Sequence, residues 1–172
     1  MNKLAILLSG LALSAMPCTS ALADSFSFSG STFSASGSFT DTTTATPGVF
    51  LGNTITGSAL IGTTVATITG FAPISTFLGN DNLYYTGAAA IALTGGRPFD
   101  FDGFAFTLSN GDAITLFSDA GGDFEILGNF STGAQIATEN SPINVTPEPG
   151  SLALLGTGAL GFVGILRRKF AA

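Results

Sequence analysis

Between residues 24 and 146, apolar and polar residues alternate in short stretches that are separated by turn-forming residues. The stretch SFSFS at 25–29 alternates serine with phenylalanine, and NTITGSALIG and TTVATITG at 53–70 are rich in β-branched residues. No stretch of this region has a sustained helical period with capping residues. A period of two between turn signals is typical of antiparallel strands, so we predict an all-β fold, an antiparallel β-sandwich. Turn signals stand at 47–48, 79–82 and 95–96.

One hairpin can be predicted in detail, in the segment FAFTLSNGDAITLF at 104–117. A two-residue turn would pair Phe106 with Thr115, whereas a three-residue loop at 109–111 would pair Phe106 with Ile114. Because a slip of one residue turns a strand's apolar side chains to the wrong face, we predict the three-residue loop with its glycine in the left-handed conformation. That register places four large apolar side chains on one face, those of Phe104, Phe106, Ile114 and Leu116.

The N-terminal residues have the layout of a secretory signal peptide. Lys3 precedes an apolar stretch that runs to about Ala15, and Ala21 and Ala23 are the small residues at positions −3 and −1 of a cleavage site. The apolar stretch is too short for a membrane anchor. We therefore predict a signal peptide at 1–23, removed by signal peptidase to leave Asp24 as the first residue. The single cysteine, Cys18, would be removed with it, so the exported part would hold no disulfide.

A second apolar segment lies at the C-terminus. Residues 151–166 carry no formal charge, and as a helix they would be about 24 Å long against a hydrocarbon core of roughly 30 Å. Arg167, Arg168 and Lys169 follow at once, and positive residues beside a span stay in the cytoplasm. We therefore predict a short transmembrane helix at 151–166 with a cytoplasmic stop-transfer end at 167–169, and the preceding domain outside the inner membrane.

The triplet Pro147, Glu148, Pro149, followed by this span and the basic end, resembles the PEP-CTERM sorting signal. The resemblance implies an exported protein of a Gram-negative bacterium that makes extracellular polysaccharide. It also implies recognition by an exosortase in the inner membrane, removal of the tail near the triplet, and delivery to the cell surface or extracellular matrix. A tail of this kind is also described as a C-terminal domain of ice-binding proteins. The sorting signal would occupy 147–172.

The region between the two signals, residues 24–146, is predicted to be one secreted domain. It also resembles small β-rich PEP-CTERM proteins of unassigned function, through SFSFSG at its start, GNDNLYY at 79–85 and FTLSNGDAITLF at 106–117. That resemblance implies a fold and carries no activity. Fourteen phenylalanines between Phe26 and Phe130 make the region too apolar for a disordered chain.

Ten acidic residues and one basic residue, Arg97, give residues 24–146 a net charge of −9. Such a domain should be repelled by nucleic acid, so we expect no nucleic-acid partner. The region also has no histidine, cysteine or lysine, which removes the components of serine and cysteine nucleophile dyads, Schiff bases and most zinc sites. We therefore predict a protein that is not an enzyme. The alternative is a glycosidase that uses two carboxylates, either Asp100 with Asp102 or Asp123 with Glu125.

Calcium is the one cofactor that the residue types suggest. Oxygen-bearing side chains gather at 80–82, at 100–102, and at Asp119, Asp123 and Glu125, and calcium takes six to eight oxygen ligands. We name the last three as candidate metal ligands. The same residue types dominate ordinary turns, which is the alternative for each cluster.

Two further binding functions are alternatives. A glycan site of the extracellular polysaccharide would use Asn80, Asp81, Asn82 and Tyr84, the one place where aromatic and polar residues cluster. Along a strand, Tyr84 and the next tyrosine would point to opposite faces, so we expect one of them in the core. Ice binding would use the threonine pairs at 54 and 56 and at 67 and 69, although threonine is common in strands for other reasons.

Overall fold

The computed structural model describes residues 23–146. Most of the predicted signal peptide, the triplet at 147–149, the predicted transmembrane helix at 151–166 and the basic end at 167–169 lie outside the described residues. Within 23–146 no helix is long and apolar enough to cross a membrane. The strands are β1 (Ala23–Ser29), β2 (Phe33–Thr43), β3 (Val49–Ile61), β4 (Thr64–Phe71), β5 (Leu83–Tyr85), β6 (Phe104–Leu108), β7 (Asp112–Asp119), β8 (Gly122–Asn129), β9 (Gln135–Glu139) and β10 (Asn144–Thr146).

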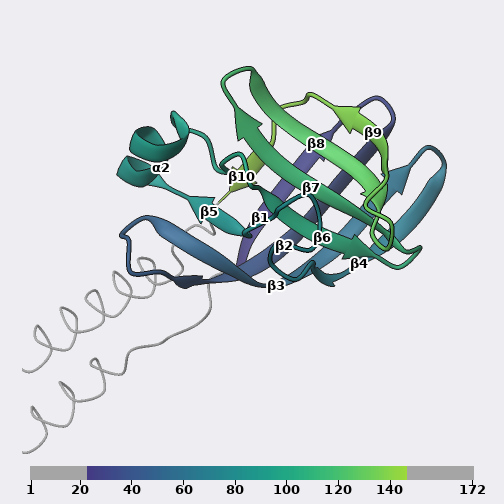
Figure 1. Cartoon of the computed structure of the whole chain (residues 1–172), viewed down its shortest axis with the longest axis horizontal. Coiled ribbons are helices and arrows are strands. Elements are labelled where there is room, and N and C mark those ends of the chain that lie inside the picture. Colours follow the sequence, from purple (N-terminus) through teal and green to yellow (C-terminus); the bar gives the residue numbers. More distant parts are fainter. Residues whose placement is uncertain (1–22, 147–172) are drawn as a thin grey trace, which may run out of the picture.

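All ladders between these strands are antiparallel, so the predicted all-β antiparallel class is confirmed. The predicted sandwich of two separate sheets is not confirmed. The strands form one sheet in the order β10-β1-β2-β3-β4-β6-β7-β8-β9, and β5 pairs with β3 beside this path (Figure 1). The sheet is curled: β1 and β6 lie four places apart in it, and yet the tilted rings of Phe26 and Phe106 are 5.4 Å apart between centroids. β-bulges at 40–41 and 127–128 add local bends to the strands.

The predicted hairpin at 104–117 is confirmed. Phe104 pairs with Leu116 and Phe106 with Ile114, and all four side chains are fully buried. Gly111 has a φ of 90°, a conformation that residues with a side chain rarely adopt, and its N–H donates to Leu108 O. The burial of the four apolar side chains thus selects the loop geometry.

The core lies inside the curl and is built largely from phenylalanine. Phe39 contacts Tyr84 and Phe104 edge-on, at 5.5 and 4.9 Å between centroids, and Phe104 contacts Phe71 in the same way at 4.6 Å. Such edge-to-face pairs are favoured by the ring quadrupoles. Gly52 makes room for the last pair, because a Cβ there would lie 2.6 Å from the Phe71 ring. The alternation read from the sequence therefore produces a main core that is largely aromatic.

One element within residues 23–146 is a helix. The helix α2 (Gly87–Thr94) was not predicted, because its sequence GAAAIALT is apolar on all sides and shows no amphipathic period. Alanine is the strongest helix former, and Gly95 ends the helix in a left-handed conformation with a φ of 69°. The sequence feature that could have predicted this helix is the alanine-rich run that ends in two glycines.

Candidate functional site

The structure brings together three carboxylates from two loops. One oxygen each of Asp81, Asp100 and Asp102 lies within 4.8 Å of the others, and this group is the one cluster of possible metal ligands among residues 23–146. Asp81 and Asp100 are half-buried, whereas Asp102 is exposed. The sequence analysis noted the two loops as separate clusters, and their meeting depends on the tertiary fold.

Hydrogen bonds fix the two loops against each other. The backbone N–H groups of Asp81 and Asn82 both donate to Gly103 O, at 3.2 and 3.0 Å. Asp100 accepts from the backbone N–H groups of Asp102 and Gly103 at 3.1 Å, and from the Tyr85 hydroxyl at 2.6 Å. These bonds hold the loop of Asp81 against the loop of Asp100 and Asp102.

The electrostatics of this acidic cluster are unfavourable in the absence of a cation. Burial, with the nearby charges of Asp100 and Asp102, raises the pKa of Asp81 to about 6, although its oxygen also accepts from Leu83 N–H at 2.9 Å. Arg97, the single basic residue of 24–146, donates instead to the Gly122 carbonyl. Three carboxylates at this spacing are a donor set that calcium accepts, and water would have to complete the six to eight oxygens.

The predicted metal ligands Asp119, Asp123 and Glu125 lie outside this acidic cluster, and each makes its own hydrogen bonds. Asp119 accepts from Gly121 N–H at 2.6 Å, which closes the β7–β8 turn. Asp123 accepts from the Ser118 hydroxyl at 2.8 Å. Glu125 is fully buried beside the core face of β7, where burial raises its pKa, and one of its oxygens accepts from a serine hydroxyl at 2.8 Å. Metal binding by these three stays a prediction, and the structure does not gather them into a compact group.

Three of the four candidate glycan residues are buried. Asn80, Asn82 and Tyr84 are at most 3% exposed, and only Asp81 of this set reaches solvent. The Asn80 and Asn82 amides both donate to Ala72 O, at 3.3 and 2.8 Å. These two side chains therefore hold the 72–82 loop, and a direct contact with a sugar stays a prediction that their burial does not favour.

Tyr84 and Tyr85 do point to opposite faces, as predicted, but both are buried. Tyr84 belongs to the main core, whereas Tyr85 packs with Val49 and the α2 residues Ala89 and Ala90. The helix that was not predicted is thus the reason why the second tyrosine is covered.

The outward side of β1 to β4 carries a regular set of hydroxyls, which we call the hydroxyl face. Its rows run across the strands, as in Ser27, Ser36 and Ser58, or Ser25, Ser38 and Thr56. Leu60 and Val65, which pair with each other, interrupt the hydroxyls at one end of this face. The twelve hydroxyl residues are Ser25, Ser27, Ser29, Ser34, Ser36, Ser38, Thr40, Thr54, Thr56, Ser58, Thr67 and Thr69.

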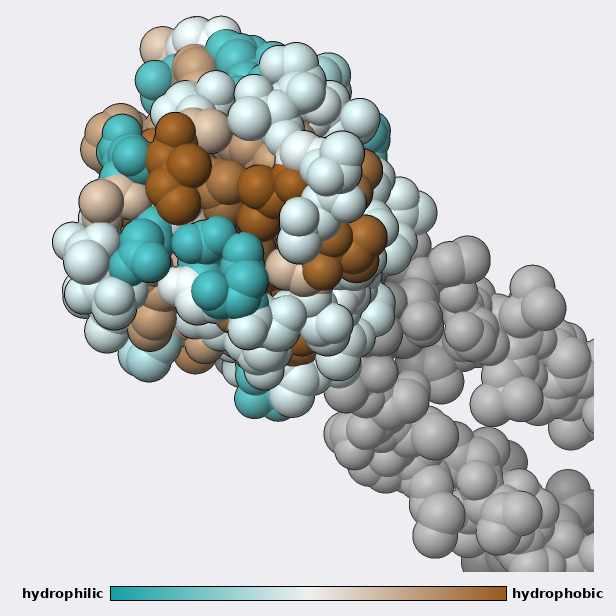
Figure 2. Space-filling model, turned by 90° about the vertical axis from the view of Figure 1, so that its right-hand side faces the viewer, coloured by the Kyte–Doolittle hydropathy of each residue, from teal (hydrophilic) through white to brown (hydrophobic). Residues whose placement is uncertain are grey.

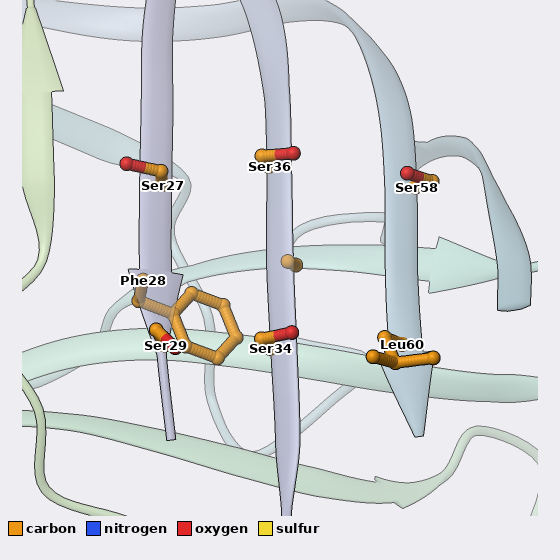
Figure 3. A pocket seen from close by; sticks show the side chains of 8 residues that line it. Ser27, Phe28, Ser29, Ser34, Ser36, Ser58 and Leu60 are labelled. Carbon is orange, nitrogen blue, oxygen red and sulfur yellow. The ribbon is translucent and has the colours of Figure 1, made fainter. Parts of the chain in front are cut away.

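A shallow hollow of about 220 Å³ lies on this face (Figure 3). Figure 3 shows Ser27, Ser36 and Ser58 in one row across three strands, and Ser29, Ser34 and Leu60 in the next. The four threonines that the sequence analysis named for ice binding are exposed members of this face. The sheet that carries them is curled and bulged, whereas an ice plane is flat, so ice binding stays a prediction.

The two ends of the described chain leave the sheet side by side. β1 and β10 are antiparallel neighbours, with Ser25 opposite Thr146 and Ser27 opposite Asn144. The first and last strands of the described domain thus pair with each other, and Thr146 lies opposite Ser25. The opposite end of the sheet carries the β3–β4 turn, and Figure 2 shows apolar side chains gathered in a band on that side of the molecule.

Comparison with known proteins identifies the tail and nothing else. A family model described as the PEP-CTERM protein-sorting motif matches residues 145–169. Neither the curated proteins nor the solved structures contain a match to this chain. The matched segment begins at Val145, inside β10, and includes the triplet, the predicted span and the basic end.

Proposed function

We propose, from the premise that this chain carries a PEP-CTERM sorting motif at residues 145–169, that it is an exported structural or binding protein without catalysis. The motif marks the chain as a secreted protein whose sorting signal is processed by an exosortase at the membrane. The proposal adds removal of the tail near the triplet, and display of the domain at the cell surface or in the extracellular matrix.

The observation that carries this proposal is the position of the motif. Its match begins at Val145, inside the last strand of the folded domain, and that strand pairs with the first strand, β1. The non-catalytic role is supported by the absence of histidine, cysteine and lysine from residues 24–146, and by the burial of Glu125.

Replacing Pro147, Glu148 and Pro149 with alanines should abolish tail removal and leave the span and its basic end intact. The protein should accumulate in the inner membrane without its signal peptide and with its tail. Replacing Arg167, Arg168 and Lys169 with serines should act differently, because each positive residue opposes translocation. That tail should pass through the membrane and give uncut protein in the periplasm or medium.

Cell fractionation with mass spectrometry of the intact protein distinguishes these outcomes. An antiserum against the domain is preferable to a tag near Asp24, because this residue is buried in β1. If the triple-alanine variant were shortened and released like the wild type, the triplet would not be the recognition element.

A second candidate function is calcium binding at Asp81, Asp100 and Asp102, favoured by their mutual distances of at most 4.8 Å. A divalent cation there would remove the repulsion between the three charges, and extracellular modules bind calcium at roughly 10⁻⁴–10⁻³ M. Such a site would stabilise the displayed domain in a calcium-containing medium.

Without calcium, the domain should become less stable as the pH rises from about 4 to about 6. Asp81 has a pKa of about 6 in the folded state against 3.8 in the reference state, so the folded state binds more protons in this window. Asp41 and Glu125 have raised pKa values and act in the same direction. Asp81→Asn should therefore remove part of the slope, and calcium should offset the loss at neutral pH in the wild type.

Thermal unfolding at several pH values, with calcium or with a chelator, measures both effects. Magnesium is the control, because it favours strict octahedral geometry and retains its waters. A wild-type melting temperature that calcium leaves unchanged at neutral pH would exclude the calcium site.

A further inference from the structure

The sorting motif and the folded domain share residues. The family match begins at Val145, and Val145 and Thr146 belong to β10, where they pair with Phe26 and Ser25 of β1. Pro147 follows directly, and proline has no N–H with which to extend the ladder. The strand therefore ends at the residue before the triplet, with no spacer between the sheet and the segment that is to be cut.

The same two residues cannot serve both roles at once. Enzymes that recognise peptide segments commonly hold the main chain extended through backbone hydrogen bonds, with pockets for alternate side chains. In β10 the backbone groups on one edge are paired with β1, and the Val145 side chain is packed against the main core. An active site that holds the residues before the triplet thus competes with β1 for them.

Few interactions join β10 to β1. β10 pairs over three residues, and the added side-chain bond, from the Ser25 hydroxyl to Thr146 O, is long at 3.4 Å. Val145 also borders a hollow of about 280 Å³ that is lined by Tyr84, Tyr85 and α2 residues. The chain before β10 is held better, since Ile143 is buried in the core and the Ser141 hydroxyl donates to Glu125 at 2.8 Å. Residues 144–146 can therefore separate from β1 while the rest of the domain stays folded.

We propose that β10 must leave β1 before the tail is cut, so that the edge of the folded domain controls access to the sorting motif. This inference rests on the proposed function, because it assumes that an exosortase removes the tail near the triplet. It assigns Val145 and Thr146 to two alternative partners, the sheet in the precursor and the processing enzyme during cleavage.

A disulfide across the β1–β10 ladder tests the proposal. Ser27 and Asn144 are direct partners and both are exposed, so Ser27→Cys with Asn144→Cys would join the strands with little disturbance of the core. The matched control is Ser36→Cys with Ser58→Cys, which joins β2 to β3 at another exposed pair. The chain's own cysteine lies in the predicted signal peptide, so it would not compete in the exported protein.

Both double variants are expressed with an exosortase, and mass spectrometry of the intact protein reports the disulfide and the tail. The β1–β10 disulfide should reduce tail removal at least tenfold, the β2–β3 disulfide should leave it unchanged, and dithiothreitol added to isolated membranes should restore it. Ser25→Cys with Thr146→Cys provides a second pair if the first does not oxidise. An oxidised β1–β10 variant that is shortened as fast as the control would overturn the inference. A wild-type protein that keeps its tail would instead overturn the proposed function.

Discussion

Replacing Phe106 with aspartate is expected to abolish cooperative folding of the domain. Phe106 is fully buried, pairs with Ile114 and Phe71, and contacts the Phe26 ring in a tilted arrangement at 5.4 Å between centroids. Removing a buried phenylalanine costs about 3–5 kcal/mol, and a carboxylate without a partner adds several more. Because a whole domain is stable by roughly 5–15 kcal/mol, the sum is comparable with all of it. Circular dichroism during heating should show no cooperative transition.

Phe101→Asp is the matched control, since the same substitution is made five residues away on a side chain that is 72% exposed. Phe101 contacts Phe117 edge-on at 6.0 Å, a pair worth about 0.5–1.5 kcal/mol. This variant should melt cooperatively, slightly below the wild type. A Phe106→Asp protein that melted at the wild-type temperature would contradict the assignment of Phe106 to the core.

Replacing Asn82 with alanine should lower the stability of the domain by about 3 kcal/mol, because buried groups lose their partners. Its side-chain oxygen accepts from Ala105 N–H at 2.9 Å, and its amide donates to Ala72 O at 2.8 Å. Asn82 also has a φ of 57°, which asparagine tolerates better than alanine. The fall in melting temperature should be roughly 10 °C.

Asn110→Ala serves as the control for this variant. Asn110 is exposed in the β6–β7 turn, and its amide donates to Asp112 at 2.7 Å, so the loss there should stay below about 1 kcal/mol. Chemical denaturation of both variants gives the comparison. Equal stabilities would show that Asn82 is not a structural residue and would return it to the candidates for ligand contact.

The local sequence pattern was sufficient to predict those features that depend only on residues close together in the chain. The register of the β6–β7 hairpin followed from two alternatives, only one of which buries Phe104, Phe106, Ile114 and Leu116 together. The positions of Tyr84 and Tyr85 on opposite faces followed from strand alternation. In each case the period of two and the cost of exposing large apolar side chains decide the outcome.

Features that depend on distant pairing could not be predicted in this way. A single curled sheet and a sandwich have the same alternation, and they differ only in whether β4 pairs with β6. The acidic cluster joins Asp81 to Asp100 and Asp102, from loops that nothing local connects. Helix α2 lacks an amphipathic period because part of its apolar surface, including Ile91 at 73% exposed, remains in solvent.

The antiparallel pairing of β1 with β10 also determines how far each part of the domain would stand from a surface that held either terminus. A strand advances about 3.3 Å per residue, so the seven residues of β1 carry the chain roughly 20 Å from the end where both termini leave. The β3–β4 turn lies at the far end, whereas the acidic cluster lies beside β5 and the start of β3, level with the attachment. A domain held by either terminus would present the β3–β4 turn outermost and keep its three carboxylates close to the supporting surface.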